Sequence, residues 1–508
     1  MTGWCGYLRR QLVLGLACTL AAFWGMSANA AGEVTVVLSE EPHVVEPCSS
    51  STSNIGRVVK QNIVETLTEI DPKDGSVTPR LATSWKQLDK NTWRFELRKG
   101  VKFHDGADFN AEAAAYAINR TLDKTLDCEV RTKFFGSLAL TTKVHGEYSL
   151  DIATDKPAPI LPTMMGTMTV MSPNTPMGKI TRDPIGTGPY TLKNWDVGKE
   201  IVLERFSGYW GEQPVVERAR YIWRSESAVR AAMIATGEAD IAPNIAVQDA
   251  TDPDMDVSYP NSETSRLRID TTLAPLTDRR VREALNLAID RDAIRGSIFS
   301  KDVIPATQLV VPSINGHNPE LKVWPYDPAR AQKLLAEARA AGVPVDKEIL
   351  LLGRINIYPN ATEVLEAIQA MLQGVGFNVK LKMIEVAEWV DMLTKPYAED
   401  RPPTLQQSQH DNNNGDAVFT VFNKYHSEGA QSTMSDSGVD ALIVKAEAAT
   451  GMERRDLFRD AFKRINDDVI ADVPMYHMVG YTRVGKRIRY QPSISTNSEL
   501  HLATVTFR

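Results

Sequence analysis

The sequence has little that would hold it in a membrane or on a nucleic acid. Beyond residue 30, no uninterrupted apolar run reaches the roughly 18 residues that span a bilayer. Its 57 basic and 64 acidic residues give a net charge of −7, and Lys and Arg form no cluster along the chain. Nucleic-acid binding needs such clusters, so we expect no nucleic acid as a partner.

Motifs for covalent or metal-dependent catalysis are also missing. The sequence contains no Gly-x-Ser-x-Gly, no His-Glu-x-x-His and no cysteine cluster. The segment 186–188, Gly-Thr-Gly, leads through Pro189 into a predicted strand instead of a helix, unlike a phosphate-binding loop. His410, His426 and His477 are dispersed, and they could bind a metal only if the fold gathers them. We therefore expect no enzyme, no cofactor and no metal site.

Cysteine is scarce, and two of the four cysteines fall within the first thirty residues. Residues 1–30 resemble a secretory signal, with Arg9 and Arg10 ahead of a mostly apolar stretch and a small-x-small pattern at 28–30. We expect cleavage near Ala30 and an exported mature protein, by either the Sec or the twin-arginine route.

The mature chain keeps only Cys48 and Cys128. In an oxidising compartment they can pair, and closing a loop of about 80 residues could contribute ~4–5 kcal/mol in the chain-entropy model. Two buried free thiols are the alternative.

Residues 348–385 have the pattern of a β-α-β unit. The continuously apolar run 349–352 is typical of a buried parallel strand, 361–373 has helical spacing, and 379–383 alternates as a strand does. Arg354 follows the first strand, at the edge where ligands bind in open α/β sheets. It is either a ligand-binding residue or a surface Arg that pairs with a neighbour such as Glu363.

Other segments give more ordinary predictions. Alternation at 93–97 followed by Lys99-Gly100 predicts a hairpin. Residues 55–70 have helical spacing, and Asn110 is a suitable N-cap for a helix over 111–122. The stretch 406–415 is polar.

Seven segments, in the same order along nearly all of the mature chain, together resemble the family 5 solute-binding proteins of ABC importers, the dipeptide, oligopeptide and nickel receptors. These segments are 79–85 (PRLATSW), 92–106 (TWRFELRKGVKFHDG), 186–190 (GTGPY), 208–211 (GYWG), 237–240 (GEAD), 278–285 (DRRVREAL) and 327–331 (DPARA).

The resemblance implies a two-lobed α/β fold, the periplasmic-binding-protein fold of type II and cluster C, with an extra subdomain in the N-terminal lobe. We expect 31–57, 184–270 and 481–508 to form the core of lobe 1, 58–183 the extra subdomain, and 271–480 lobe 2. It also implies a periplasmic monomer that captures a peptide or peptide-like zwitterionic solute and delivers it to a membrane permease without catalysis.

The resemblance further suggests ligand contacts. Arg354 matches the Arg that receives the ligand carboxylate in dipeptide receptors, and Asp416, preceded by Asn414 and Gly415, partly matches the Asp that receives the ligand amine. Ala417 stands where those receptors usually have Pro, which puts an ordinary dipeptide in doubt and leaves a longer peptide or an opine.

His410 with the Asn run 412–414 would suit a sugar-like ligand or a metal chelate, unless this stretch is a solvated loop. A secreted hydrolase is the alternative from a different functional class.

Overall fold

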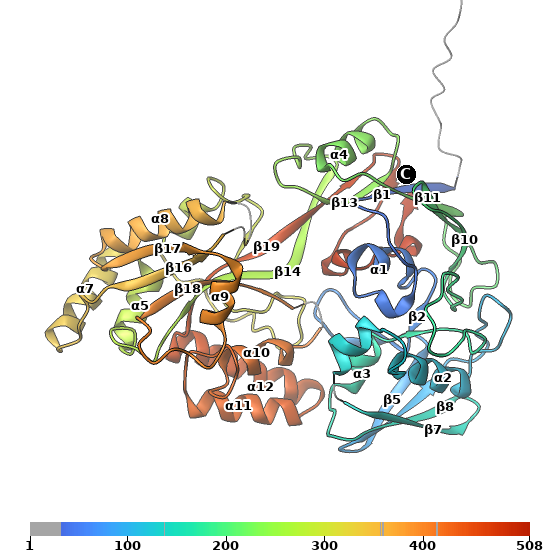
Figure 1. Ribbon diagram of the computed structural model, residues 1–508, viewed down its shortest axis with the longest axis horizontal. Helices are drawn as coiled ribbons and strands as arrows, with labels where there is room; N and C mark the ends of the chain where they lie inside the picture. Colours follow the sequence, from blue (N-terminus) through green and yellow to red (C-terminus); the bar gives the residue numbers. More distant parts are fainter. Residues whose placement is uncertain (1–31, 137, 356, 358–359, 413–414) are drawn as a thin grey trace, which may run out of the picture.

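The computed structural model describes residues 32–508 except 137, 356, 358, 359, 413 and 414. Two large bodies lie side by side and are joined by two long strands, β14 (Asp256–Ile269) and β19 (Asp472–Val484) (Figure 1). Residues 1–30, the predicted signal peptide, lie outside the described residues. No helix among the described residues has both the length and the apolar character needed to cross a membrane.

One mixed sheet runs through both bodies. Its strands follow the order β10-β11-β12-β1-β13-β19-β14-β18-β16-β17, with β15 paired to β19. The strands β19 and β14 lie in the middle of this order, and they pair with each other in antiparallel fashion over much of their length. The connection between the bodies is therefore itself a piece of hydrogen-bonded sheet.

Lobe 1 is built on the β10-β11-β12-β1-β13 end of this sheet. Its core is formed by apolar residues of β1, α1 and the strands beside them, with Leu500, Leu502 and Val505 of the C-terminal segment packed on the same cluster. The elements of lobe 1 are β1 (Glu33–Leu38), α1 (Ser53–Val59), β10 (Tyr190–Asp196), β11 (Glu200–Arg205), β12 (Arg218–Trp223), α4 (Ser227–Ala235), β13 (Ile241–Ile245), β20 (Ile488–Arg489) and β21 (Thr506–Phe507).

An extra subdomain lies below lobe 1 in the view of Figure 1 and has its own apolar core. A four-stranded sheet in the order β5-β6-β8-β7 packs against α2, whose first turn is capped by the Asn110 side chain. The elements are β2 (Glu65–Thr66), β3 (Thr68–Ile70), β4 (Val77–Pro79), β5 (Ala82–Asp89), β6 (Thr92–Leu97), α2 (Ala111–Leu122), β7 (Leu140–Gly146), β8 (Ser149–Thr154), α3 (Leu161–Met165) and β9 (Thr169–Val170).

Lobe 2 holds the predicted β-α-β unit and a group of helices. Helices α5, α7 and α8 contribute to one core cluster with β16, and α10, α11 and α12 form a second cluster. Its elements are α5 (Arg279–Leu287), α6 (Arg291–Ile294), β15 (Ile304–Pro305), α7 (Pro328–Ala340), β16 (Ile349–Arg354), α8 (Ala361–Gly374), β17 (Val379–Ile384), α9 (Val386–Leu393), β18 (Thr404–Asp411), α10 (Val418–Tyr425), α11 (Ser437–Ala448) and α12 (Gly451–Lys463).

The two connecting strands are irregular where they pass between the lobes. Their register shifts between Pro260 and Thr264, and Ser262 in this bulge has a φ of 71°. A bulge bends a strand and interrupts its ladder, and this one lies where the connecting strands pass between the lobes.

The helix predicted over 55–70 is wrong for residues 60–70. Helix α1 ends at Val59, and the strands β2 and β3 follow. The Asn62 side chain donates a hydrogen bond to the carbonyl of Leu500, far away in the chain, so tertiary contacts outweigh the local apolar spacing here.

Cys48 and Cys128 are joined by a disulfide bond, which ties the segment before α1 to the extra subdomain.

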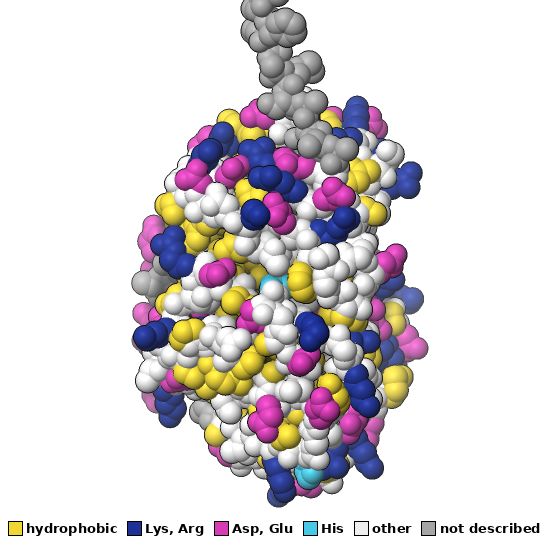
Figure 2. Space-filling view, turned by 90° about the vertical axis from the view of Figure 1, so that its right-hand side faces the viewer, with side chains coloured by type: hydrophobic (Ala, Val, Ile, Leu, Met, Phe, Trp, Pro, Cys, Tyr) yellow, Lys and Arg dark blue, Asp and Glu magenta, His cyan; other side chains and the backbone are white. Residues whose placement is uncertain are grey.

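On the face shown in Figure 2, acidic and basic side chains are interspersed, with no broad patch of either sign. The residue boundaries predicted for the lobes stay a proposal.

Candidate functional site

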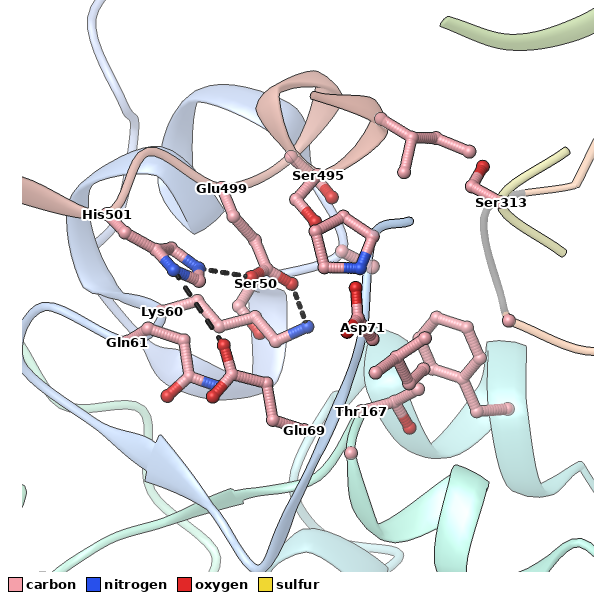
Figure 3. Close-up of a pocket in the computed structure, with 18 of the residues that line it drawn as sticks. Ser50, Lys60, Gln61, Glu69, Asp71, Thr167, Ser313, Ser495, Glu499 and His501 are labelled. Atoms are coloured by element: carbon pink, nitrogen blue, oxygen red, sulfur yellow. Dashed lines mark hydrogen bonds and ion pairs between the residues drawn. The ribbon is translucent and has the colours of Figure 1, made fainter. Parts of the chain in front are cut away.

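A cavity between the two lobes is the first part of the candidate site, and we call it cavity A (Figure 3). It is narrow in this arrangement of the lobes, with a free volume of about 70 Å³. Lobe 1 and the C-terminal segment line one side, the extra subdomain contributes residues 69–72, and lobe 2 contributes Ser313, Ile314 and Gly415. The wall thus comes from segments that are hundreds of residues apart in sequence.

A charged network occupies one end of cavity A. The Lys60 ammonium donates to the Glu499 carboxylate, and His501 Nε2 lies 2.7 Å from Glu499 Oε2. His501 Nδ1 is 3.9 Å from Glu69 Oε1. Burial favours the neutral form of Glu499, but Lys60 and His501 outweigh it and lower the pKa of Glu499 to about 2. These charges therefore compensate one another within the protein.

Three buried polar atoms around cavity A have no hydrogen-bond partner among the described residues. They are Ser50 Oγ, Gln61 Oε1 and Ser313 Oγ, on side chains that are 3%, 3% and 8% exposed. Two come from the lobe 1 side and one from lobe 2. A buried unpaired polar atom costs ~1–3 kcal/mol, so a polar ligand that bonds to these atoms from both lobes would recover that free energy.

A second cavity, cavity B, lies beside the connecting strands and has a free volume of about 200 Å³. Ile245 and Val247 of lobe 1 face Ile298 and Phe299 of lobe 2 across it, and Glu263 of β14 lines it between them. Burial, with a smaller contribution from Asp411, raises the pKa of Glu263. Asn497 connects the two regions, because it lies next to Ser498 of cavity A and donates to the carbonyl of Asn261 of cavity B.

Arg354 is the last residue of β16 and is half-buried. Its guanidinium lies 5.5 Å from the centre of the Trp389 ring, and its backbone N–H donates to Gln407 Oε1 at 3.0 Å. Its Nε is buried and has no hydrogen-bond partner among the described residues. Arg354 borders neither cavity A nor cavity B, so its predicted contact with the ligand stays a prediction.

Asp416 is 1% exposed and already holds several donors. Its Oδ1 accepts from Arg454 at 2.8 Å and its Oδ2 accepts from the same guanidinium at 2.9 Å. Asn315 Nδ2 and the backbone N–H of Val418 donate to it as well. A ligand amine would have to displace the Arg454 guanidinium, so the predicted amine contact stays untested.

His410 is buried in β18, and its Nε2 lies 2.7 Å from the Thr420 hydroxyl. Burial, and then the nearby cations Lys424 and Arg266, hold its pKa well below the usual range, so the ring is neutral. Asn414, the other predicted contact, lies outside the described residues. Within the part of the chain that is described, no three His, Cys, Asp or Glu side chains come together to hold a metal ion.

Sequence reasoning missed the residues that line cavity A. Ser50, Lys60 and Glu69 follow β1, whereas Ser313 and Glu499 come from a lobe 2 loop and from the end of the chain. No spacing rule joins positions so far apart, and only the fold brings them together.

Comparison with known proteins gives one family and one fold. The sequence matches the family described as bacterial extracellular solute-binding proteins, family 5 Middle, over residues 76–434. The glutathione-binding protein GsiB of Salmonella choleraesuis (strain SC-B67) is 30% identical over 388 residues, which cover 74% of this chain and 73% of that protein.

Two solved structures show the same fold. HbpA2 from Haemophilus parasuis matches with a TM-score of 0.82 and 21% identity, covering 94% of this chain and 100% of that chain. The periplasmic binding protein DppA from Helicobacter pylori, in complex with the peptide STSA, matches with a TM-score of 0.63 and 20% identity, covering 94% and 98%. The predicted two-lobed α/β fold is confirmed.

Proposed function

Because the chain belongs to the family 5 bacterial extracellular solute-binding proteins and is thus the substrate-binding component of an ABC importer, we propose that its ligand is a peptide or peptide-like zwitterionic solute. The ligand is of about tripeptide size and is held between the lobes. The relative GsiB, named as a glutathione-binding protein, supports this class, since glutathione is a modified tripeptide.

The observation that carries this proposal is the lining of cavity A. Ser50 and Gln61 on one side and Ser313 on the other present buried polar atoms without partners among the described residues. Peptide amides carry both donors and acceptors, so a peptide suits unpaired polar atoms of either kind on the two lobes.

Arg354 is the proposed contact for a ligand carboxylate. A planar guanidinium can donate two parallel charge-assisted hydrogen bonds to a carboxylate, and an aromatic ring under it fixes its orientation. The Trp389 ring provides that support here. Arg354, the last residue of β16, also lies at the carboxyl edge of the parallel strands, where ligands bind in α/β sheets.

Binding is coupled to rotation of the lobes about the bulge at Pro260–Glu263. Ser313 and Ser50 lie on different lobes, so a ligand that bonds to both has a higher affinity for the arrangement in which the lobes are together. That differential affinity is the only free energy available for closure. The closed form is then the one that a membrane permease recognises.

The remaining parts of the proposal concern location and partners. The signal-like residues 1–30 favour export, and the permease subunits of an ABC importer are the partners of the mature monomer. We propose that the protein binds its ligand without chemical change.

The test starts from the purified mature protein. Denaturation followed by mass spectrometry should release a stoichiometric small peptide or peptide conjugate, and calorimetry with glutathione and with trialanine should give saturable binding. Failure of both experiments would overturn the proposal. Steady conversion of the peptide, detected as product accumulating beyond one equivalent, would instead support a hydrolase.

A further inference from the structure

We infer that Asp71 receives the ammonium group of the ligand and selects for solutes with a free amine. The inference rests on the proposed function and assigns one of its specificity residues. Asp71 follows β3 (Thr68–Ile70) and lines cavity A, where Figure 3 shows its side chain between Ser495 and Thr167 in this view.

Two other carboxylates, those of Glu69 and Glu499, line cavity A. The negative charge of the Glu499 carboxylate is compensated by Lys60 and His501. Glu69 lies 3.5 Å from the Arg80 guanidinium and 3.9 Å from His501. Their charges already have cationic partners, so neither is suited to bind an additional ammonium group.

Asp71 differs from both. Its Oδ1 accepts the backbone N–H of Lys73 at 2.8 Å, and it forms no ion pair with any described residue. It is half-buried and lines cavity A without a cationic partner among the described residues. A carboxylate of this kind, facing an interlobe cavity, is suited to a charge-assisted hydrogen bond with an incoming ammonium group.

Asp416 is the acid that the family resemblance suggests for this role. Both of its oxygens are bonded to Arg454. Breaking a buried ion pair leaves an uncompensated charge, which is strongly unfavourable. Binding of a ligand amine therefore costs much less free energy at Asp71 than at Asp416.

The β3–β4 turn is held against lobe 2. A Cβ added to Gly75 would lie 2.5 Å from the backbone N of Asn315 and 2.6 Å from the carbonyl O of Gly415, so the two backbones are in close contact. Asp74 of the same turn lies 3.6 Å from Arg455 of α12. Asp71 thus reaches the ligand from the turn that contacts lobe 2.

The ammonium would find further acceptors nearby. The hydroxyls of Ser50 and Ser313 line the same cavity and are buried without partners among the described residues.

The experiment uses calorimetry with two pairs of probes: glutathione and N-acetylglutathione, and trialanine and N-acetyltrialanine. Asp71→Asn keeps an oxygen for the Lys73 N–H but removes the charge. It should weaken binding of the free-amine probes by about 30-fold and change binding of the acetylated probes by no more than about twofold. Asp346→Asn is the control, since it removes an equal charge from an exposed position outside cavity A.

A selectivity ratio unchanged by Asp71→Asn would overturn the assignment, and so would an equal loss for free and acetylated probes. Selective loss of the free-amine probes in Asp416→Asn, with Asp71→Asn unaffected, would return the role to Asp416. If the wild-type protein binds none of the probes, the proposed function fails, and this assignment fails with it.

Discussion

Arg354 and Glu499 are two charged residues with opposite surroundings. Glu499 is held by Lys60 and His501, and its charge contributes to the stability of the folded state. Arg354 keeps a buried Nε without a partner among the described residues, which is unfavourable for folding. Residues that bear such a cost are candidates for function, whereas compensated pairs are candidates for structure.

Replacement of Arg354 should therefore affect binding more than stability. Arg354→Ala should weaken peptide binding by ~2–5 kcal/mol in calorimetry if the partner carboxylate is buried, because one charge is then left unpaired. Arg354→Lys should recover only part of this loss, since an ammonium cannot form two parallel bonds. Arg339→Ala, which removes an exposed Arg from its pair with Asp346, is the control. An unchanged affinity for Arg354→Ala would exclude the role.

Glu499 should make the protein sensitive to acid. Its pKa falls from 4.5 to about 2 on folding, so its contribution is fully present above the unfolded pKa and is lost as the pH falls towards 2. The shift corresponds to ~3 kcal/mol of unfolding free energy. Chemical denaturation between pH 6 and about pH 2 should show a steeper loss for the wild type than for Glu499→Gln. Parallel pH profiles for the two proteins would contradict this.

At the scale of single elements, β18 departs from the hydrophobic pattern expected of a buried strand. Strand β18 lies inside the large sheet between β14 and β16, yet its sequence is polar. Gln406, Ser408 and His410 are buried, and the Gln406 and His410 side chains form hydrogen bonds to Trp389 and Thr420. The strand is thus stabilised by polar contacts that hydrophobic periodicity does not register.

The connecting strands should be intolerant of a side chain at Gly480. A Cβ there would lie 2.7 Å from the Tyr259 ring, which is 2% exposed and held by Asn244 and Asn497. Gly480→Ala should lower the unfolding free energy by ~1–3 kcal/mol. Gly374→Ala, at the end of α8 with nothing within 4 Å of the new Cβ, is the control and should be neutral or slightly stabilising. Identical denaturation curves for wild type and Gly480→Ala would argue against this packing.

At the scale of the whole molecule, a continuous sheet and a disulfide bond connect the two lobes and the extra subdomain. The sheet passes from lobe 1 to lobe 2 through β19 and β14, whereas the Cys48–Cys128 disulfide ties lobe 1 to the extra subdomain. The disulfide leaves the two lobes free to rotate, because lobe 2 lies outside the loop that it closes. The disulfide therefore contributes to stability, whereas the connecting strands β14 and β19 allow ligand-driven closure.

Removal of the disulfide should destabilise the extra subdomain. The loop spans 80 residues, and its closure contributes ~4–5 kcal/mol in the chain-entropy model. Denaturation of Cys48→Ala/Cys128→Ala should show this loss, and a reducing agent should lower the midpoint of the wild type but not of the variant. A wild-type midpoint that is insensitive to full reduction would contradict the expectation.

The sequence by itself determined the β-α-β unit of lobe 2 and the family. The β-α-β unit was predicted at 349–352, 361–373 and 379–383, and it is found at Ile349–Arg354, Ala361–Gly374 and Val379–Ile384. Its apolar spacing, and the caps of α2 and α7, are local signals that persist in the fold. Seven ordered motifs identified the family correctly, because each is a short segment that can be read without knowing its neighbours.

Only the tertiary structure decided which residues share the site. Cavity A gathers Ser50, Asp71, Ser313 and Glu499 from four distant segments, and Asp416 meets Arg454 across 38 residues. The charge state and hydrogen-bonding capacity of an acid depend on these non-local neighbours, which a linear pattern does not specify. For this reason the sequence favoured Asp416 as the amine contact, while the fold, by joining Asp416 to Arg454, favours Asp71.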